Sequence, residues 1–461
     1  MNNDRQTMLA TESIGKLLLR LSLPAGIGMF VMSLYNMVDT IFIGQVVGPL
    51  GIAGLTIVFP VQMLVMGLGM IVGIGGASVI SRNIGAGNMD RAERTLGNSV
   101  FYVILMGVLI PAVGLPNLTS LLRLFGATDT ILPFSSSYLE IILLGTFFQT
   151  FAMGISQLVR AEGNARVPMV SMMIGAGLNI ALDVVLILVL DMGIRGAAIA
   201  TILAQMVTSL YVIHYYLFRN STLKIHLKNL IPEGRVLMEI FIIGLGAFFR
   251  TTGGSLAAIV INRSLGAYGG DLSIASYGIV MRLFMFLFMP IISVGQGLQP
   301  ILGFSYGAGR HDRSLHAIKL AIIVTTIMST FAFMVVYLLP APIFLIFTKN
   351  ESLVAAGSDS AKIIFLAAFL LGFQMIGSVV FQALGKAVPT FLTATARQVL
   401  FQLPLVFFLP KYLGVNGIWY SFPISDILST LLTLGLLIPQ IRSLRRAWAE
   451  TIAQEVTLEA R

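Results

Sequence analysis

The heptapeptide GAGNMDR, Gly85–Arg91, returns later in the chain as GAGRHDR, Gly307–Arg313. Other stretches return at nearly the same offset: the run 53–75 as 275–297, LRLFGATD (122–129) near Phe347, and GIRG (193–196) as GVNG (414–417). Separate matches at one offset are hard to obtain by chance, and self-similarity at a fixed period is the signature of a repeat. The sequence therefore predicts a tandem duplication.

The composition decides what kind of unit is duplicated. The chain has 461 residues, of which 57% are hydrophobic and only 11% are charged. A soluble protein of this length cannot bury so much apolar side chain, and apolar runs of about 20 residues are long enough to cross a bilayer as helices. We predict an all-α polytopic membrane protein with about twelve transmembrane helices, near residues 17–43, 52–80, 96–121, 133–159, 167–190, 196–218, 236–262, 273–301, 315–347, 355–383, 388–410 and 416–440.

Each copy of the repeat then holds about six spans. Because six is even, both copies enter the membrane in the same orientation, and a pseudo-two-fold axis along the membrane normal relates them. The cleft between two such lobes is the natural substrate route of a transporter, although a duplicated bundle also suits a structural or channel protein. The predicted division is an N-terminal lobe at 1–218, a linker at 219–235, a C-terminal lobe at 236–440 and an amphipathic tail at 441–461, expected on the inner membrane surface.

The charge distribution predicts orientation. The net charge is +9, and Lys and Arg gather in the loops on the side of the N-terminus, including the linker 219–235. In a membrane protein such an excess marks the cytoplasmic side and does not indicate nucleic acid binding. We therefore expect a multi-pass protein of the cell (inner) membrane with both termini in the cytoplasm. The chain contains no Cys, which excludes disulfides and thiol catalysis.

Two carboxylates interrupt apolar spans of the first half. Asp39 lies in the first span and Asp183 in the fifth. An ionisable group inside a membrane is costly and is a candidate functional site. Asn36 lies three residues before Asp39 and Asn179 four before Asp183, so each amide shares a helix face with an acid. Further candidates to line this site are Tyr35, Tyr138, Ser156, Gln157 and Thr201.

These oxygen-rich side chains suit a hard monovalent cation. They also suit a shared proton, because two close carboxylates in a low dielectric cannot both stay ionised. The alternative is that the polar groups only satisfy one another and hold the helices together.

The second copy differs from the first at these positions. At the repeat offset Ile261 replaces Asp39 and Pro404 replaces Asp183, so we expect ion coupling in the first half only. The second half instead carries arginines that could bind an anionic group or a lipid headgroup, or pair with Glu239 and the backbone, namely Arg250, Arg282 and Arg397.

Several of these motifs resemble one family. The sequences LYNMVD (34–39), RAEGNA (160–165), LNIALD (178–183), GIRGAAIAT (193–201) and GQGLQPILGFSYGAG (295–309), with Pro24 in the first span, resemble the multidrug and toxic compound extrusion (MATE) transporters, in particular their prokaryotic DNA-damage-inducible (DinF-like) subgroup. The resemblance covers nearly the whole chain. It implies twelve helices in two lobes and export of bulky, often cationic, amphipathic compounds, driven by inward movement of H⁺ or Na⁺.

The resemblance also implies a cation and proton site. Its members would be Asp39, Asn179, Asp183 and Thr201, with Tyr138 nearby and Na⁺ as the possible bound metal; no other cofactor is expected. Met32 stands where related members carry Gln, and Ser156 or Gln157 stands where an Asn is expected late in the fourth span. Pro24 removes a backbone hydrogen bond within the first span and is a hinge candidate.

Alternative functions remain at this point. A flippase for lipid-linked oligosaccharides or lipids, from the same wider superfamily, would favour a cationic cleft. An enzyme is not expected, because no His pair, Ser/Lys dyad or metal-ligand cluster falls at membrane depth, and no GxxxxGK[ST] motif indicates ATP hydrolysis. The expected partners are small-molecule drugs or toxic organic cations, H⁺ or Na⁺ and membrane lipids, with no nucleic acid, and the expected state is a monomer.

Overall fold

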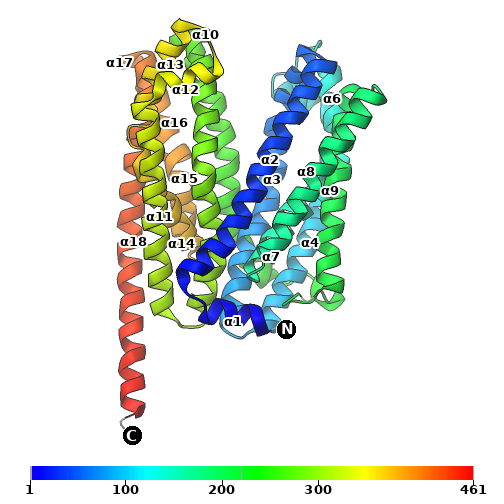
Figure 1. Ribbon diagram of the computed structural model, residues 1–461. Coiled ribbons are helices and arrows are strands. Elements are labelled where there is room, and N and C mark those ends of the chain that lie inside the picture. The colour runs from blue at the N-terminus through cyan, green and yellow to red at the C-terminus, as the bar shows by residue number, and fades with distance from the viewer. Residues whose placement is uncertain (1–2, 220, 460–461) are drawn as a thin grey trace. The chain divides into compact units, whose positions relative to one another are not determined.

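The fold is built entirely from helices in the part of the chain that the structure describes. The computed structural model describes residues 3–219 and 221–459, with side chains at all of these positions except 3, 4, 36, 49 and 455–459. Within these ranges there is no strand, which confirms the all-α class (Figure 1). Nine of the described helices are long and apolar enough to cross a membrane, and two bent helix pairs raise the number of spans to 11. The 74-residue helix α10 is interrupted at Gly270, whose non-helical φ of 65° and ψ of −169° divide it into two helices, so the described spans reach the predicted twelve.

Contacts divide the chain into two units. Unit 1 comprises residues 1–12 and 23–252, and unit 2 comprises residues 13–22 and 253–461. The predicted lobes had their boundaries in the linker 219–235, whereas the first part of α10 makes its contacts within unit 1. The contact boundary also crosses α2 between Ser22 and Leu23, next to Pro24. The hinge at Pro24 remains a prediction, because α2 is one unbroken helix.

Unit 1 is a bundle around α3, which packs against α4, α6 and α7, while α8 and α9 pack side by side (Figure 1). Its core includes Leu139, Ile142 and Ala197. Its elements are α1 (Asn3–Thr11), most of α2 (Ile14–Val46), α3 (Pro49–Gly85), α4 (Met89–Gly114), α5 (Leu118–Leu124), α6 (Leu132–Leu144), α7 (Thr146–Ala161), α8 (Arg166–Asp183), the π-helix η1 (Val184–Val189), α9 (Gly193–Phe218), the 3₁₀ turn η2 (Leu227–Leu230) and the start of α10 (Gly234–Gly307).

Unit 2 repeats much of this order of elements. In it α11 packs against α14, and α18 packs against η4. Its core includes the aromatic side chains of Phe288, Phe344 and Phe365. Its elements are the rest of α10, α11 (His311–Leu338), α12 (Pro340–Phe347), α13 (Glu351–Ile364), the 3₁₀ turn η3 (Ala368–Leu370), α14 (Leu371–Ala383), α15 (Ala387–Thr395), the π-helix η4 (Ala396–Gln402), α16 (Leu403–Phe408), α17 (Pro410–Leu413) and α18 (Val415–Glu459).

The repeated heptapeptides form the same turn in both units. Gly87 has φ 74° and Gly309 has φ 69°, a left-handed conformation that glycine adopts without steric cost. In each turn the glycine N–H donates to the carbonyl three residues back at 3.1 Å, and the next N–H donates five residues back at 2.9 Å. This paired pattern is the Schellman motif, which ends a helix and satisfies its last carbonyls. The sequence repeat is therefore also a repeat of backbone geometry.

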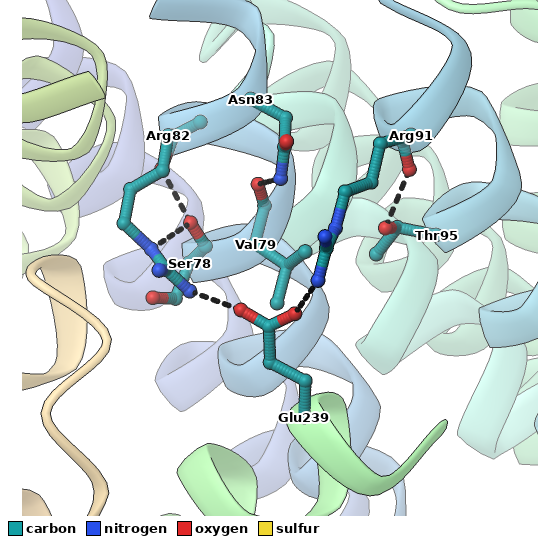
Figure 2. A network of polar contacts seen from close by, with 8 residues as sticks. Ser78, Val79, Arg82, Asn83, Arg91, Thr95 and Glu239 are labelled. Atoms are coloured by element: carbon teal, nitrogen blue, oxygen red, sulfur yellow. Dashed lines mark hydrogen bonds and ion pairs between the residues drawn. The ribbon is translucent and has the colours of Figure 1, made fainter. Parts of the chain in front are cut away.

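The start of α10 is fixed to unit 1 by an ion-pair network. Glu239 lies between two arginines, as Figure 2 shows. Arg82 Nη2, from the end of α3, donates to Glu239 Oε1 at 3.0 Å, and Arg91 Nη2, from the start of α4, donates to Oε2 at 2.6 Å. Backbones also approach closely here, because a Cβ built on Gly75 of α3 would lie 2.0 Å from the carbonyl oxygen of Ile240. Both features explain why this segment belongs to unit 1.

The C-terminal tail continues the last span. We expected an amphipathic helix from Ile441 on the inner membrane surface, and α18 runs without a break through this position to Glu459 (Figure 1), while the surface location stays a prediction. No Gly or Pro follows Pro439, so nothing in the sequence ends the helix there. At 45 residues α18 is about 67 Å long, more than twice the thickness of a bilayer core of about 30 Å. The described tail is therefore a continuation of the last span.

Candidate functional site

The two predicted carboxylates come together inside unit 1. Asp183 is fully buried and Asp39 is 9% exposed, and the two are close enough to act on each other electrostatically. Asp183 is the last residue of α8, where the helix widens into the π-helix η1. Short π-helical segments often lie at functional sites, because the extra residue per turn displaces side chains from the regular helix faces.

Neighbouring polar groups complete this cluster, which we call the carboxylate site. With its amide oriented to satisfy both neighbours, Asn179 donates to Asp183 Oδ2 at 3.3 Å and accepts from the Thr201 backbone N–H at 3.3 Å. The buried phenol of Tyr138, on α6, interacts with Thr201 and Asp39. Helices α2, α6, α8 and α9 therefore each supply a side chain to this cluster.

One oxygen of each acid remains unsatisfied. Among the described residues, Oδ1 of Asp39 and Oδ1 of Asp183 are buried and have no hydrogen-bond partner. A buried acceptor without a donor is costly, and a proton or a cation would relieve that cost. The carboxylate, amide and hydroxyl oxygens of the site fit Na⁺, a hard ion that prefers oxygen ligands, and they fit a shared proton equally well.

The structure places the remaining candidates as follows. Met32 and Tyr35 lie on α2 with Asp39, and Met32 is two turns before it, on the same helix face. The side chain of Asn36 lies outside the described part of the chain. Gln62 of α3 also interacts with Tyr138 and was missed, although a lone amide within an apolar span could have indicated it.

Ser156 and Gln157 belong to a different part of unit 1. Both are buried on α7, and Gln157 Oε1 accepts from Arg160 Nη1 at 2.9 Å. Tyr138 precedes Ser156 by 18 residues along the bent pair α6–α7, which corresponds to about 27 Å measured along the helices. The structure therefore separates Ser156 and Gln157 from the carboxylate site.

A further buried acid of unit 1 was quoted within RAEGNA but given no role. Glu162 follows α7, outside the membrane-spanning segments, and is 1% exposed. It accepts from Ser221 Oγ at 2.9 Å, from the Thr222 backbone N–H at 3.0 Å and from Tyr215 Oη at 3.2 Å. Burial raises the pKa of Glu162 to about 7, although these hydrogen bonds favour the ionised form. This acid ties the end of α7 to the beginning of the linker.

Unit 2 contains a buried acid that we did not expect from the sequence. The positions that correspond to Asp39 and Asp183 are apolar there, but Asp426 of α18 is a buried carboxylate that the sequence comparison overlooked. It pairs with Arg397, whereas Glu239 pairs with Arg82 and Arg91 and with none of the three arginines suggested. A search of the second copy for any acid within a span would have found Asp426.

Comparison with known proteins decides the family. A family model described as MatE matches the chain twice, over residues 24–185 and 247–408. The chain belongs to the MatE family. The two matches are equal in length and agree with the tandem duplication, so the MATE fold accounts for both units.

Individual MATE proteins are similar over nearly the whole chain. Multidrug export protein MepA of Staphylococcus aureus (strain MRSA252) is 26% identical over 431 residues, 94% of this chain and 95% of that protein. A structure of the MATE multidrug transporter DinF-BH is 41% identical, covers 93% of this chain and 96% of that chain, and has a TM-score of 0.88. A crystal structure of a MATE in complex with MaL6 is 27% identical, with 96% and 99% coverage and a TM-score of 0.90. The resemblance to MATE transporters is thereby confirmed.

Proposed function

We propose that this protein is a secondary active multidrug exporter that moves bulky, often cationic, amphipathic compounds out of the cell in exchange for H⁺ or Na⁺. Its family and its relatives, among them multidrug export proteins, support multidrug efflux. They do not favour the flippase alternative. The exporter would act as a monomer in contact with membrane lipids.

One observation carries the ion coupling. Asp39 and Asp183 are brought together in unit 1, and each keeps a buried oxygen without a partner among the described residues. Binding of H⁺ or Na⁺ would remove negative charge from the interior of this unit. A ligand shifts a conformational equilibrium by its differential affinity for the two states, so an ion that prefers one helix packing drives the change. Asn179, Asp183, Asp39 and Thr201 would hold Na⁺, with Tyr138 beside them.

Transport by the purified protein in proteoliposomes tests this proposal. A pH gradient and a Na⁺ gradient are imposed separately, and export of a fluorescent cationic dye is followed. We expect Asp39→Asn and Asp183→Asn to abolish gradient-driven export, because neither variant can release the coupling charge. The matched control is Asp129→Asn, whose side chain is 87% exposed, and which should export like the parent. Export at the parental rate by either coupling variant would show that its acid is not the coupling group.

We also propose that both termini lie in the cytoplasm. An even number of spans puts the termini on one side, and the basic linker favours the inner side. Because the chain contains no Cys, single cysteines can be introduced at positions 224 and 349 and labelled from outside with an impermeant reagent. We expect labelling at position 349 only. The reverse pattern would overturn the orientation.

A further inference from the structure

Unit 2 contains a charge pair that the coupling mechanism does not use. Arg397 lies on η4 and Asp426 on α18, and Arg397 Nε donates to Asp426 Oδ1 at 2.5 Å. The Asp426 side chain is 1% exposed and the Arg397 side chain 17% exposed. Both residues lie within membrane-spanning segments, where charges are costly and usually mark functional sites.

The fold of a lobe does not require this pair. Aligning the repeats on Val167-Pro168 with Val388-Pro389, and on the GIRG and GVNG motifs, places Ala176 opposite Arg397 and Gln205 opposite Asp426. Unit 1 therefore forms the corresponding helices with neither charge. Replacing a buried ion pair by neutral residues is often neutral or stabilising, so packing alone gives no reason to keep one.

The guanidinium of Arg397 is held in a fixed orientation. Its Nε is engaged by Asp426, and its Cζ lies 4.9 Å from the ring centroid of Phe284, on α10, in a cation–π contact. Among the described residues Arg397 makes its hydrogen bond and ion pair through Nε alone, so its terminal amino groups, Nη1 and Nη2, have no acceptor. These two groups form the fork that binds carboxylate or phosphate oxygens in a bidentate manner.

A second donor lies on the same π-helix. Gln402 follows Arg397 by five residues, about one turn of η4, and is 3% exposed. Its Nε2 is buried and has no hydrogen-bond partner in the described part of the chain. Asp426 Oδ2 is also buried without a partner among the described residues, but the unsatisfied groups on η4 itself are donors, which favours a ligand that brings acceptor oxygens.

We propose that Arg397, oriented by Asp426 and Phe284, binds the anionic group, a carboxylate or a phosphate, of an amphipathic ligand. The arginine fork would bind the anion of the ligand, while Phe284, stacked on Phe288 with ring centroids 4.3 Å apart, would hold the guanidinium in place from its other face. The site is separate from the carboxylate site of unit 1 and extends the substrate range from cations to zwitterions. Identifying the ligand as an exported compound rests on the proposed function. Equilibrium binding without a gradient can nevertheless be measured independently of antiport.

A matched pair of dyes tests the site: a zwitterionic rhodamine with a free carboxylate, and its ethyl ester. Dissociation constants are measured by fluorescence polarisation on the purified full-length protein. We expect Arg397→Gln to weaken binding of the carboxylate dye at least about tenfold, as for loss of a charge-assisted hydrogen bond, and to leave the ester within about twofold. Equal losses for both dyes, or no loss for either, would overturn the proposal.

Asp426→Asn separates a binding role from a structural one. The amide oxygen can still accept from Arg397 Nε, but the carboxylate no longer competes with the ligand for the guanidinium charge. We therefore expect the carboxylate dye to bind more tightly and the ester to bind unchanged, whereas a purely structural pair would weaken both. If Arg397→Gln does not fold, the double variant Arg397→Gln/Asp426→Asn removes both partners and should show the same selective loss.

The anionic group could also come from a lipid. Phosphatidylglycerol or phosphatidylcholine is added to the micelles during binding of the carboxylate dye. If phosphatidylglycerol displaces the carboxylate dye and phosphatidylcholine does not, and if this displacement is absent in Arg397→Gln, the occupant is an anionic lipid headgroup. If neither lipid displaces the dye, the occupant is the exported compound. The site would stand in both cases, and displacement that is equal in the parent and in Arg397→Gln would contradict it.

Discussion

The network around Glu239 leads to a quantitative prediction. In Glu239→Gln the side chain keeps its size but loses its charge, so the two arginines in Figure 2 lose their shared counter-charge. Glu239 joins the start of α10 to Arg82 on α3 and to Arg91 on α4. We expect the variant to loosen this segment of unit 1.

The exposure of the three side chains determines how much stability Glu239→Gln should lose. Glu239 and Arg82 are only 26% and 20% exposed, and a charge-assisted hydrogen bond in such a setting contributes about 1.5 kcal/mol or more. Arg91 is 48% exposed, so solvent screening reduces its ion pair to about 0.5 kcal/mol. The expected loss in the free energy of unfolding is therefore about 2 kcal/mol.

Unfolding of the purified protein in mixed micelles, titrated with SDS, measures this loss. A double-mutant cycle of Glu239→Gln with Arg82→Gln isolates the pair, and we expect a coupling energy of about 1 kcal/mol or more. The matched control is Asp90→Asn on α4, whose ion pair with Arg94 at 2.8 Å has side chains 62% and 48% exposed. This variant should cost no more than about 0.5 kcal/mol. A coupling energy near zero, or an equal cost in the control, would refute the reasoning.

Two further predictions use the same assay. Gly75→Ala should destabilise the protein by at least about 2 kcal/mol, because the added Cβ would overlap the Ile240 carbonyl. The control Gly177→Ala on α8, where the added Cβ meets open space, should be neutral or slightly stabilising. Equal effects of the two substitutions would contradict the close approach of the backbones at Gly75. Burial raises the pKa of Glu162 from 4.5 to about 7, so the native state keeps the proton of this acid to a higher pH than the unfolded state does. The free energy of unfolding should therefore fall by up to about 3 kcal/mol as the pH rises from 4.5 to about 7. Glu162→Gln should flatten that fall, and an unchanged pH dependence would rule out Glu162 as its origin.

The sequence alone determined the fold class, the number of spans and the duplication. Apolar length and a constant offset are properties of the chain that do not depend on folding, so they can be read directly. The repeated heptapeptides marked the positions of Gly87 and Gly309, but the left-handed Schellman turns that they form were seen only in the structure. Asp39 and Asp183 were recognisable because an acid in an apolar span has a cost that demands a reason.

Only the tertiary structure decided which polar groups meet. Arg397 and Asp426 are 29 residues apart, and Glu239 lies 157 residues from Arg82, so no local pattern links them. Gln157 was a candidate to line the carboxylate site, whereas its contact with Arg160, three residues further along α7, is local and could have been read from the spacing. The position of a residue in a predicted span indicates that its side chain lies within the membrane. Which other side chain it contacts depends on how each helix is rotated and how far it is shifted along its neighbours. Packing between distant segments fixes both.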